Sequence, residues 1–534
     1  MKNKLPILLL IGLVIFCYIN SLGNNFVSDD RGILINAPSW DLSSVFSRPY
    51  TFIRPLLYLI TYKVAGFSPV FFRLPNILFH MGAVLLIYVI IKNLANGRVA
   101  LLSSSLFAVH PLMVESITWI SGGVYVQYSF FFLLSFFFYL RSRKSKKNYI
   151  FSLLAYTCAL ISSEKAITLA LTFFVYEFCF GDLKKHWIKA SPYFILSSIW
   201  VMLHFLRFAE RVSYFEDQAL DLTPYNPFFQ VPIAITSYIQ LLIWPSDLTI
   251  YHSEMIFSQV EYAIRVVGFL GFLVFVGYCL WRNRFLFFWF CFFVIALLPT
   301  INPFVLGWIV AERYVYIAII GIMVPIAYVV EKSFSFPKIK VATMSFFVIV
   351  IALFSIRTIV RNIDWATEDN LWLAAAKTSP SSAQNHNNLG DYYGRHGDYA
   401  NSILEFKRAI TLKQNYADAY HNLGNAYRDS GQTDLGIQSY EKAYSFNPKL
   451  WQSYQNIAAI YYMQGKYKDA QTYLQKGLTA NPNNTNLLVV LSLVYVKSGE
   501  RDKAREVLLN ALSIDPNSKL IKQALSQLQN NTLQ

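Results

Sequence analysis

The sequence predicts an all-α protein in which a polytopic membrane helix bundle precedes a soluble solenoid of helical repeats. Hydrophobic residues make up 55% of the 534 residues and charged residues only 14%, which is typical of a membrane protein. Apolar runs long enough to cross a bilayer recur up to about residue 360. Beyond that point the chain is polar and repeats with a period of 34 residues, which predicts stacked helical units.

The formal net charge of +15 does not indicate a nucleic-acid partner, because the basic residues lie in short clusters beside the apolar runs. Examples are 141–147, 184–186 and 282–284. Such clusters mark the cytoplasmic ends of membrane spans. We therefore predict membrane lipid, and no nucleic acid, as the partner of this part. The five cysteines all lie in apolar runs without metal-ligand spacing, which indicates packing.

The first apolar run, 5–22, follows Lys2 and Lys4 and is predicted to be an anchor with its N-terminus inside. A cleaved signal peptide is the alternative, but no Ala-x-Ala site follows. An anchor places the next residues on the extracytoplasmic face. Residues 31–69 are too mixed to span the bilayer, and 54–66 is expected to form an amphipathic helix on its surface.

Further apolar spans complete the bundle. They are predicted near 70–91, 98–114, 123–140, 149–162, 165–180, 190–208, 264–281, 285–300, 314–331 and 341–358. The stretch 229–262 is expected to be re-entrant or interfacial, because a crossing there would put Arg282 and Arg284 outside. This gives about eleven crossings for a membrane domain at 1–360, and the part that follows lies on the extracytoplasmic face.

The polar C-terminal part consists of self-similar units that resemble the tetratricopeptide repeat (TPR). The second unit has Leu423, Gly424, Tyr427, Tyr440, Ala443 and Pro448 at positions that recur in the others. The units are 383–416, 417–450, 451–484 and 485–518, preceded by a linking helix at 361–382 and followed by a capping helix at 519–534. The resemblance implies two antiparallel helices per unit and a concave surface that holds a protein or peptide.

Asparagines recur on the predicted repeats. Asn388, Asn422 and Asn456 occupy one position of successive units, and Asn425 lies one helical turn from Asn422. Side-chain amides in register could bond a peptide backbone. The alternative, that they cap or solvate their helices, stays open at this point.

Two adjacent carboxylates, Asp29 and Asp30, directly follow the first apolar run. A solvated loop is the simplest interpretation. We favour a catalytic carboxylate pair at the membrane surface, because ionisable groups beside a span are costly and usually functional. No P-loop, dinucleotide fingerprint, His-Glu-x-x-His or Gly-x-Ser-x-Gly occurs in the sequence, so these common chemistries find no support.

The motifs together resemble membrane glycosyltransferases of the GT-C type. The particular likeness is to the family that joins transmembrane and tetratricopeptide-repeat parts (TMTC), which includes protein O-mannosyltransferases of the endoplasmic reticulum and bacterial relatives. The matching residues are Phe26-x-x-Asp29-Asp30, Arg54-Pro55-Leu56, Asn76 to His80, Phe107 to Pro111 with Glu115, and Ala311 to Tyr316. The chain departs from the family pattern at Ser163, where a Lys often precedes the Glu, and at 122–125, where Gly-Arg-x-Asp is common.

The resemblance implies transfer of a sugar, mannose in the protein O-mannosyltransferases, from a polyprenyl-phosphate donor to a protein Ser or Thr hydroxyl. It implies that Asp29 is the general base and that Asp30 orients the acceptor or a divalent cation, the metal ligand if there is one. The donor phosphate is then expected at Arg54, Lys165 and Arg313, and the rim at His110, Glu115, Glu164 and Glu312. Arg54 as a snorkelling surface anchor, and Glu312 and Arg313 as a mutual ion pair, are the alternatives.

Two other functions stay open. One is a glycosyltransferase that modifies a surface glycan or lipid, and the other is a non-catalytic, membrane-anchored scaffold for complex assembly. The expected location is the inner or plasma membrane of a bacterium, with the repeats in the periplasm or outside, or the endoplasmic reticulum membrane of a eukaryote.

Overall fold

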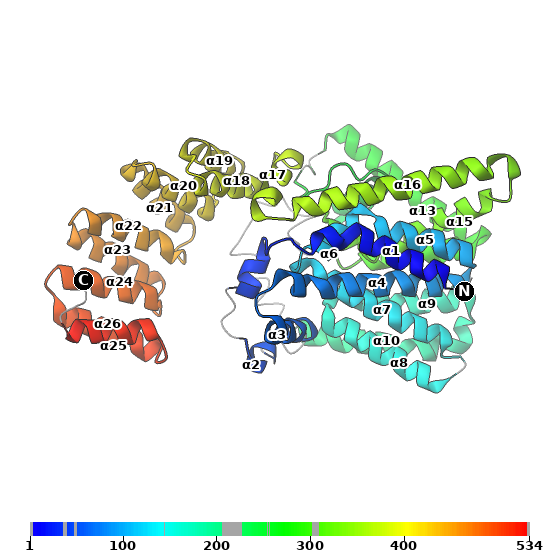
Figure 1. Cartoon of the computed structure of the whole chain (residues 1–534), viewed down its shortest axis with the longest axis horizontal. Coiled ribbons are helices and arrows are strands. Elements are labelled where there is room, and N and C mark those ends of the chain that lie inside the picture. The colour runs from blue at the N-terminus through cyan, green and yellow to red at the C-terminus, as the bar shows by residue number, and fades with distance from the viewer. Residues whose placement is uncertain are drawn as a thin grey trace. The chain divides into compact units, whose positions relative to one another are not determined.

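The computed structural model describes residues 4–35, 40–46, 51–143, 145–205, 227–253, 255, 257–301 and 309–530. Every regular element in these ranges is helical, so the predicted all-α class is confirmed. The chain divides into two compact units, Met1–Ser379 and Pro380–Gln534 (Figure 1). Each is described by itself.

The first unit contains α1 (Leu5–Tyr18), α2 (Leu42–Phe46), α3 (Ile53–Ala65), α4 (Pro69–Leu94), α5 (Gly97–Val109), α6 (Val114–Thr118), α7 (Val124–Arg141), α8 (Lys146–Ser162), α9 (Ala170–Phe180), α10 (Leu183–Phe205), α12 (Pro227–Ile243), α13 (Gln259–Arg282), α14 (Arg284–Leu297), α15 (Ile320–Ser333), α16 (Pro337–Asp364) and α17 (Glu368–Thr378). Short 3₁₀ turns lie between them: η1 (Ile19–Ser21), η3 (Pro111–Met113), η4 (Ser121–Gly123), η5 (Glu164–Leu169) and η6 (Glu312–Val315); η2 (Arg31–Ile35) is a π-helical turn.

Among the described residues, four helical segments are long and apolar enough to cross a membrane: α4, residues 121–141, α13 and α16. A fifth arises if α5 and Pro111–Thr118, which are bent by 56°, form one span. Several other predicted spans are shorter as helices, for example α8 with 17 residues and α15 with 14. The count of about eleven crossings is therefore not confirmed by this criterion.

Element boundaries differ from the sequence expectation at three places, each for a local reason. The helix predicted at 98–114 ends at Val109, because His110 is extended and Pro111 starts a new turn. The predicted span 190–208 begins earlier, so the basic cluster at 184–189 forms the first turns of α10. The last predicted span continues to Asp364, and α17 follows as a separate helix capped by the Thr367 hydroxyl.

The core of the first unit is largely aromatic. Phe173 of α9 stacks on Tyr193 of α10 with ring centroids 3.8 Å apart, and Phe136 of α7 lies edge-on against Tyr176. α1 packs against α4, α5 and α16, so that residues from both ends of the unit lie side by side (Figure 1). This packing brings the loop after α1 to the C-terminal end of α16.

The second unit is a stack of helix pairs: α18 (Ala383–Arg395) with α19 (Tyr399–Leu412), α20 (Ala417–Asp429) with α21 (Thr433–Phe446), α22 (Trp451–Met463) with α23 (Tyr467–Ala480), α24 (Thr485–Lys497) with α25 (Arg501–Ile514), and a last helix α26 (Lys519–Gln529). Glycines with positive φ, between 72° and 83°, recur in the turn between the helices of each pair, at Gly397, Gly431, Gly465 and Gly499. Within a pair the helices approach closely, since a Cβ on Gly424 would lie 2.6 Å from the Tyr440 ring. The predicted TPR architecture is confirmed.

Candidate active site

The loop after α1 holds its two carboxylates in opposite environments. The Asp30 side chain has no exposed surface, and its Oδ1 and Oδ2 accept the backbone N–H groups of Ser121, at 2.8 Å, and Val27, at 3.3 Å. Asp29 is exposed and has no hydrogen bond or ion pair among the described residues. Ser28, with φ of 54°, lies in the turn directly before the two carboxylates. Asp29 is thus the carboxylate that is free to meet another molecule.

Asp30 holds this loop in place. Burial raises the pKa of the Asp30 carboxyl, and the hydrogen bonds from Ser121 and Val27 together with the nearby Arg73 oppose that rise. Its two oxygens are occupied by backbone amides. The structure therefore gives Asp30 a supporting position, which differs from the expectation that it faces the acceptor or a cation. No group of three or more His, Cys, Asp or Glu side chains suited to a metal occurs in the described ranges.

Arg73 of α4 is a buried charged residue beside the Asp29 loop that the sequence analysis did not identify. It is fully buried, and its guanidinium donates to the backbone carbonyls of Thr118 at 2.6 Å, Asn24 at 2.7 Å and Asn25 at 2.9 Å. A further bond reaches Leu22 O at 3.3 Å. Arg73 therefore ties the Asp29 loop to residues 117–123. The available signal was that it is the one charged residue of the predicted span at 70–91.

Residues 117–123, which we call the central segment, connect the other parts of the site. Asn76 Nδ2 donates to the carbonyls of Ile117 and Trp119, each at 3.3 Å. Arg54 Nη2 donates to Ile120 O at 2.6 Å, and its Nε donates to the Tyr58 hydroxyl at 2.7 Å. Arg54 is thus half-buried and bonded to this segment, so the alternative of a snorkelling surface anchor does not describe it.

Gly122 and Gly123 of the central segment lie so close to neighbouring residues that a side chain would not fit there. A Cβ on Gly123 would lie 1.9 Å from Asn76 Oδ1, and one on Gly122 would lie 2.3 Å from Glu115 O. The departure from the family pattern at 122–125 therefore coincides with a close approach of α4 and α6 to the central segment.

Replacing Gly123 by Ala is expected to displace Asn76 and to lower the free energy of unfolding by about 1–3 kcal/mol, the usual effect of overpacking. Thermal unfolding in detergent measures the change. Gly271→Ala in α13 is the matched control, because its Cβ would meet no atom within 4 Å. Equal unfolding midpoints for the two variants would contradict this packing.

A second cluster joins α6 to η6. The buried Glu115 forms an ion pair with the Arg313 guanidinium and also accepts the Arg313 backbone N–H at 2.7 Å. Arg313 lies over the rings of Tyr314, at 5.1 Å, and Trp119, at 5.8 Å, the latter in the central segment. The sequence alternative in which Arg313 pairs with Glu312 is wrong, because Glu115 takes that place.

Lys165 of η5 lies over Tyr125, the neighbour of the Tyr314 ring. Its Nζ is 5.1 Å from the Tyr125 ring, whose centroid is 6.0 Å from that of Tyr314. Its ion pair with Glu164 is long, 3.8 Å, and the side chain keeps 22% of its surface exposed against 15% for Arg313. Two partly exposed cations therefore flank the Tyr125 and Tyr314 rings.

His110 and Glu312 lie inside the protein, with no exposed surface. His110 Nδ1 accepts the Leu112 N–H at 3.3 Å, so Nε2 carries the proton that is donated to Leu242 O at 3.0 Å. Glu312 Oε1 pairs with Arg361 of α16 at 3.0 Å. Burial raises the pKa of the Glu312 carboxyl, and the Arg361 guanidinium opposes that rise. His110 and Glu312 therefore act on the rim of the site only through the residues that they contact.

In the repeat unit, the predicted asparagines bond across successive repeats. Asn422 Nδ2 donates to Asn387 Oδ1 at 3.0 Å, and Asn456 Nδ2 donates to Asn425 Oδ1 at 2.9 Å. Asn425 also accepts the Tyr440 hydroxyl at 2.7 Å, and Asn388 is half-buried. The structure therefore adds an inter-repeat role to the hypothesis that these amides bind a peptide.

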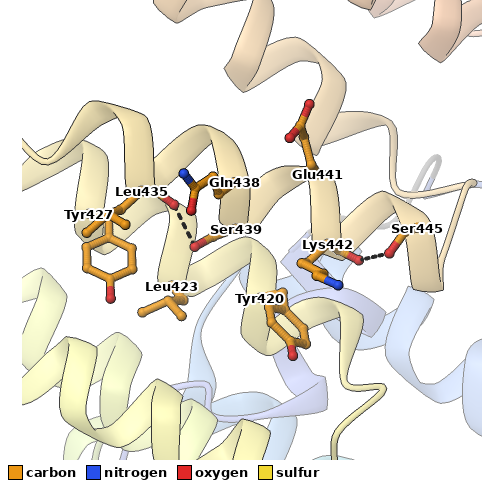
Figure 2. Close-up of a pocket in the computed structure, with 9 residues that line it drawn as sticks. All are labelled: Tyr420, Leu423, Tyr427, Leu435, Gln438, Ser439, Glu441, Lys442 and Ser445. Carbon is orange, nitrogen blue, oxygen red and sulfur yellow. Dashed lines mark hydrogen bonds between the residues drawn. The ribbon is translucent and has the colours of Figure 1, made fainter.

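Two shallow pockets mark the repeat surface. One of about 240 Å³ is lined by Asn422 and Asn425 together with Asp391, Arg395, Arg428 and Asp429. The other, of about 530 Å³, lies between α20 and α21, where Tyr420, Gln438, Glu441 and Lys442 line it (Figure 2). Both are open at the surface; Leu423, Tyr427 and Leu435 make the larger one mainly apolar, whereas polar and apolar groups line the smaller one about equally.

Comparisons with known proteins agree with the two parts of the chain. Residues 51–208 match the family described as dolichyl-phosphate-mannose-protein mannosyltransferase. Residues 395–431, 415–483 and 461–528 match tetratricopeptide repeat families. The first match contains Arg54, Arg73, Glu115 and Lys165, whereas Asp29 and Asp30 precede it.

Several curated relatives are named as protein O-mannosyl-transferases. The chain is 25% identical over 473 residues to human protein O-mannosyl-transferase TMTC3, covering 76% of this chain and 51% of the relative. It is 24% identical to protein O-mannosyl-transferase F38B6.6 of Caenorhabditis elegans, covering 77% and 63%. The chain thus spans about half to two thirds of the length of these relatives.

Among solved structures, the crystal structure of MamA is 22% identical, with a TM-score of 0.26, and the match covers 29% of this chain and 90% of that one. The likeness predicted from the motifs is confirmed: the chain joins a segment similar to dolichyl-phosphate-mannose-protein mannosyltransferases to tetratricopeptide repeats, and it resembles the TMTC group of protein O-mannosyl-transferases.

Proposed function

We propose that this protein is a membrane glycosyltransferase that moves mannose from a polyprenyl-phosphate donor to a Ser or Thr hydroxyl of a protein on the extracytoplasmic face. The observation that supports it most is the exposed, unpaired Asp29, held by a buried framework to the same central segment as the cationic cluster. The family matched by residues 51–208 supports mannose and a lipid-phosphate donor.

In the proposed reaction, Asp29 is the base and the Arg313 and Lys165 cations bind the phosphate. Asp29 takes the proton from the acceptor hydroxyl as its oxygen attacks the sugar C1 atom. The bond between C1 and the phosphate oxygen breaks, and its electron pair leaves with the polyprenyl phosphate. Arg313 and Lys165, beside the Tyr125 and Tyr314 rings, stabilise the charge on that phosphate. The proton ends on Asp29.

The remaining site residues support these groups. Arg54 and Asp30 fix the central segment and the Asp29 loop, while Glu115 orients Arg313. Glu164 orients Lys165, His110 holds the backbone at Leu242, and Glu312 pairs with the Arg361 side chain. In this proposal the repeats recruit the acceptor protein through the grooves at Asn422 and Asn425. The membrane is an inner or plasma membrane in a bacterium and the endoplasmic reticulum membrane in a eukaryote.

The proposal is tested by donor turnover. The purified chain in nanodiscs receives a panel of polyprenyl-phosphate sugars together with a Ser/Thr-containing peptide mixture, and release of polyprenyl phosphate is followed. Release from the mannose donor by the native chain and by Asp434→Asn, an exposed carboxylate on α21, with none by Asp29→Asn, supports it. Equal release by all three proteins, or none from any donor by a folded native chain, refutes it.

Lys165→Gln is expected to raise the donor KM about tenfold to a hundredfold, because a hydrogen bond to a charged group contributes about 1.5–3 kcal/mol. The acceptor KM should stay unchanged. Lys185→Gln, 79% exposed in the basic cluster at the start of α10, is the control. Initial rates at varied donor concentration measure the effect. A donor KM within about twofold of the control would remove Lys165 from the phosphate site.

A further inference from the structure

The C-terminal end of α16 contacts the end of α1, the turns η1 and η3, and α6. The Thr358 hydroxyl donates to Val109 O at the end of α5, at 2.7 Å. The next turn carries Arg361 and Asn362, which are both buried although their side chains are strongly polar. Buried polar side chains are usually hydrogen-bonded, although Arg361 Nε has no partner among the described residues. Their partners show what this helix end holds together.

Asn362 joins the chain that precedes Asp29 to the central segment. Its Nδ2 donates to Cys17 O and to Asn20 Oδ1, each at 2.7 Å, at the end of α1. Its Oδ1 accepts the Thr118 hydroxyl at 2.6 Å, in the central segment. Its backbone carbonyl accepts Asn24 Nδ2 at 2.8 Å, within the loop itself. One side chain therefore fixes the end of α1 against the central segment.

The residues that follow Asn362 continue this contact. Ala366 O accepts the Asn25 backbone N–H at 2.9 Å, and Glu368 pairs with Arg31, just past Asp30, at 2.9 Å. Trp365 is fully buried and stacks on Trp119, with ring centroids 5.6 Å apart. The Asp29 loop is thus bonded to the α16–α17 turn both before and after its carboxylates.

Arg361 contacts the opposite half of the site. Its Nη2 pairs with Glu312 Oε1 at 3.0 Å, and its Nη1 pairs with Asp364 at 2.9 Å. Glu312 directly precedes Arg313, the cation assigned to the donor phosphate. Adjacent residues of one helix end therefore hold the acceptor side, through Asn362, and the donor side, through Arg361.

We propose that Asn362 and Arg361 are positioning residues that set the distance between the Asp29 carboxylate and the Arg313 guanidinium. They touch neither substrate and act through the Asp29 loop and η6. The inference rests on the proposed glycosyl transfer, since it is the reacting groups of that reaction whose separation they fix. A misplacement of about 1 Å in such a pair is enough to cost about a hundredfold in rate.

The test separates positioning from binding. Thr118→Val removes only the hydroxyl that bonds to Asn362, and Arg361→Lys keeps the charge while losing the two-armed contact. Both variants are expected to lower kcat about tenfold to a hundredfold with the donor KM changed less than about twofold, the signature of an interaction that acts on the transition state. Thr479→Val, whose exposed hydroxyl bonds only within α23, is the control and keeps the native kcat.

A direct binding measurement completes the design. Polyprenyl phosphate titrated into each protein in nanodiscs, read by tryptophan fluorescence, is expected to give the native Kd for both variants. A native kcat in both variants overturns the positioning role and leaves the proposed function intact. The same conclusion follows if the variants lose activity only through a raised donor KM and Kd. Absence of turnover by the folded native protein overturns both. Asn362→Ala is a third variant. If Asn362→Ala does not fold, Thr118→Val still tests the positioning role of Asn362.

Discussion

Asp29→Asn is expected to lower the rate of sugar transfer about a hundredfold to ten-thousandfold, the contribution of a positioned general base. The asparagine amide has the same shape but cannot take a proton at neutral pH. Because Asp29 is exposed and unpaired among the described residues, folding should be unaffected. Single-turnover rates from a polyprenyl-phosphate mannose donor measure the first effect, and thermal unfolding in the same detergent measures the second.

The neighbouring carboxylate provides the internal comparison. Asp30→Asn keeps one acceptor oxygen but places an NH₂ group against one of the two backbone N–H donors, Val27 or Ser121. An unsatisfied buried donor costs about 1–3 kcal/mol of stability, so this variant should unfold at a lower temperature, whereas Asp29→Asn should not. Loss of activity with full stability in Asp30→Asn, or the reverse pattern in Asp29→Asn, would show that the two roles have been exchanged.

Arg73→Met is expected to remove at least about 3 kcal/mol from the free energy of unfolding, because charged hydrogen bonds contribute about 1.5–3 kcal/mol each and buried carbonyls would lose their donor. The Arg73 guanidinium donates to the backbone carbonyls of Thr118, Asn24 and Asn25. Methionine fills a similar space but has no hydrogen-bond donor. Arg73→Lys should be intermediate, since one ammonium cannot reach all of these carbonyls.

Denaturant unfolding monitored by tryptophan fluorescence measures the Arg73 variants. Arg98→Met, an exposed arginine in the first turn of α5, is the matched control and should change stability by less than about 0.5 kcal/mol. If Arg73→Met were as stable as this control, the Asp29 loop would not depend on Arg73 for its position.

The repeats and the helical class could be predicted from the sequence because their signals are local. A 34-residue period reflects contacts between neighbouring helices, and the first helix of each pair begins at Ala383, Ala417, Trp451 and Thr485, where the periodicity placed the units. The number of membrane crossings could not be predicted in the same way. Hydropathy registers apolar length, but not the break at His110-Pro111 or the separate turn η5 ahead of α9.

The candidate site residues were proposed from motifs, but the contacts among them could not be predicted from the sequence. Asp29, Glu115 and Arg313 were identified from motifs, and the structure brings Glu115 and Arg313 together across 198 residues of sequence. The partner of Glu312 was not predictable, because Arg361 lies beyond the last predicted span and had no motif. Arg73 resembled an isolated charge in an apolar run, and only the fold shows that backbone carbonyls from two distant loops surround it.

The central claim is tested most directly by the mass of an acceptor peptide after incubation with the native chain in nanodiscs and polyprenyl-phosphate mannose. The proposed chemistry predicts one added hexose on a Ser or Thr hydroxyl, released polyprenyl phosphate in equal amount, and neither product with Asp29→Asn. Polyprenyl phosphate released without any sugar on peptide, or hexose transferred equally by the Asp29→Asn variant, would contradict it.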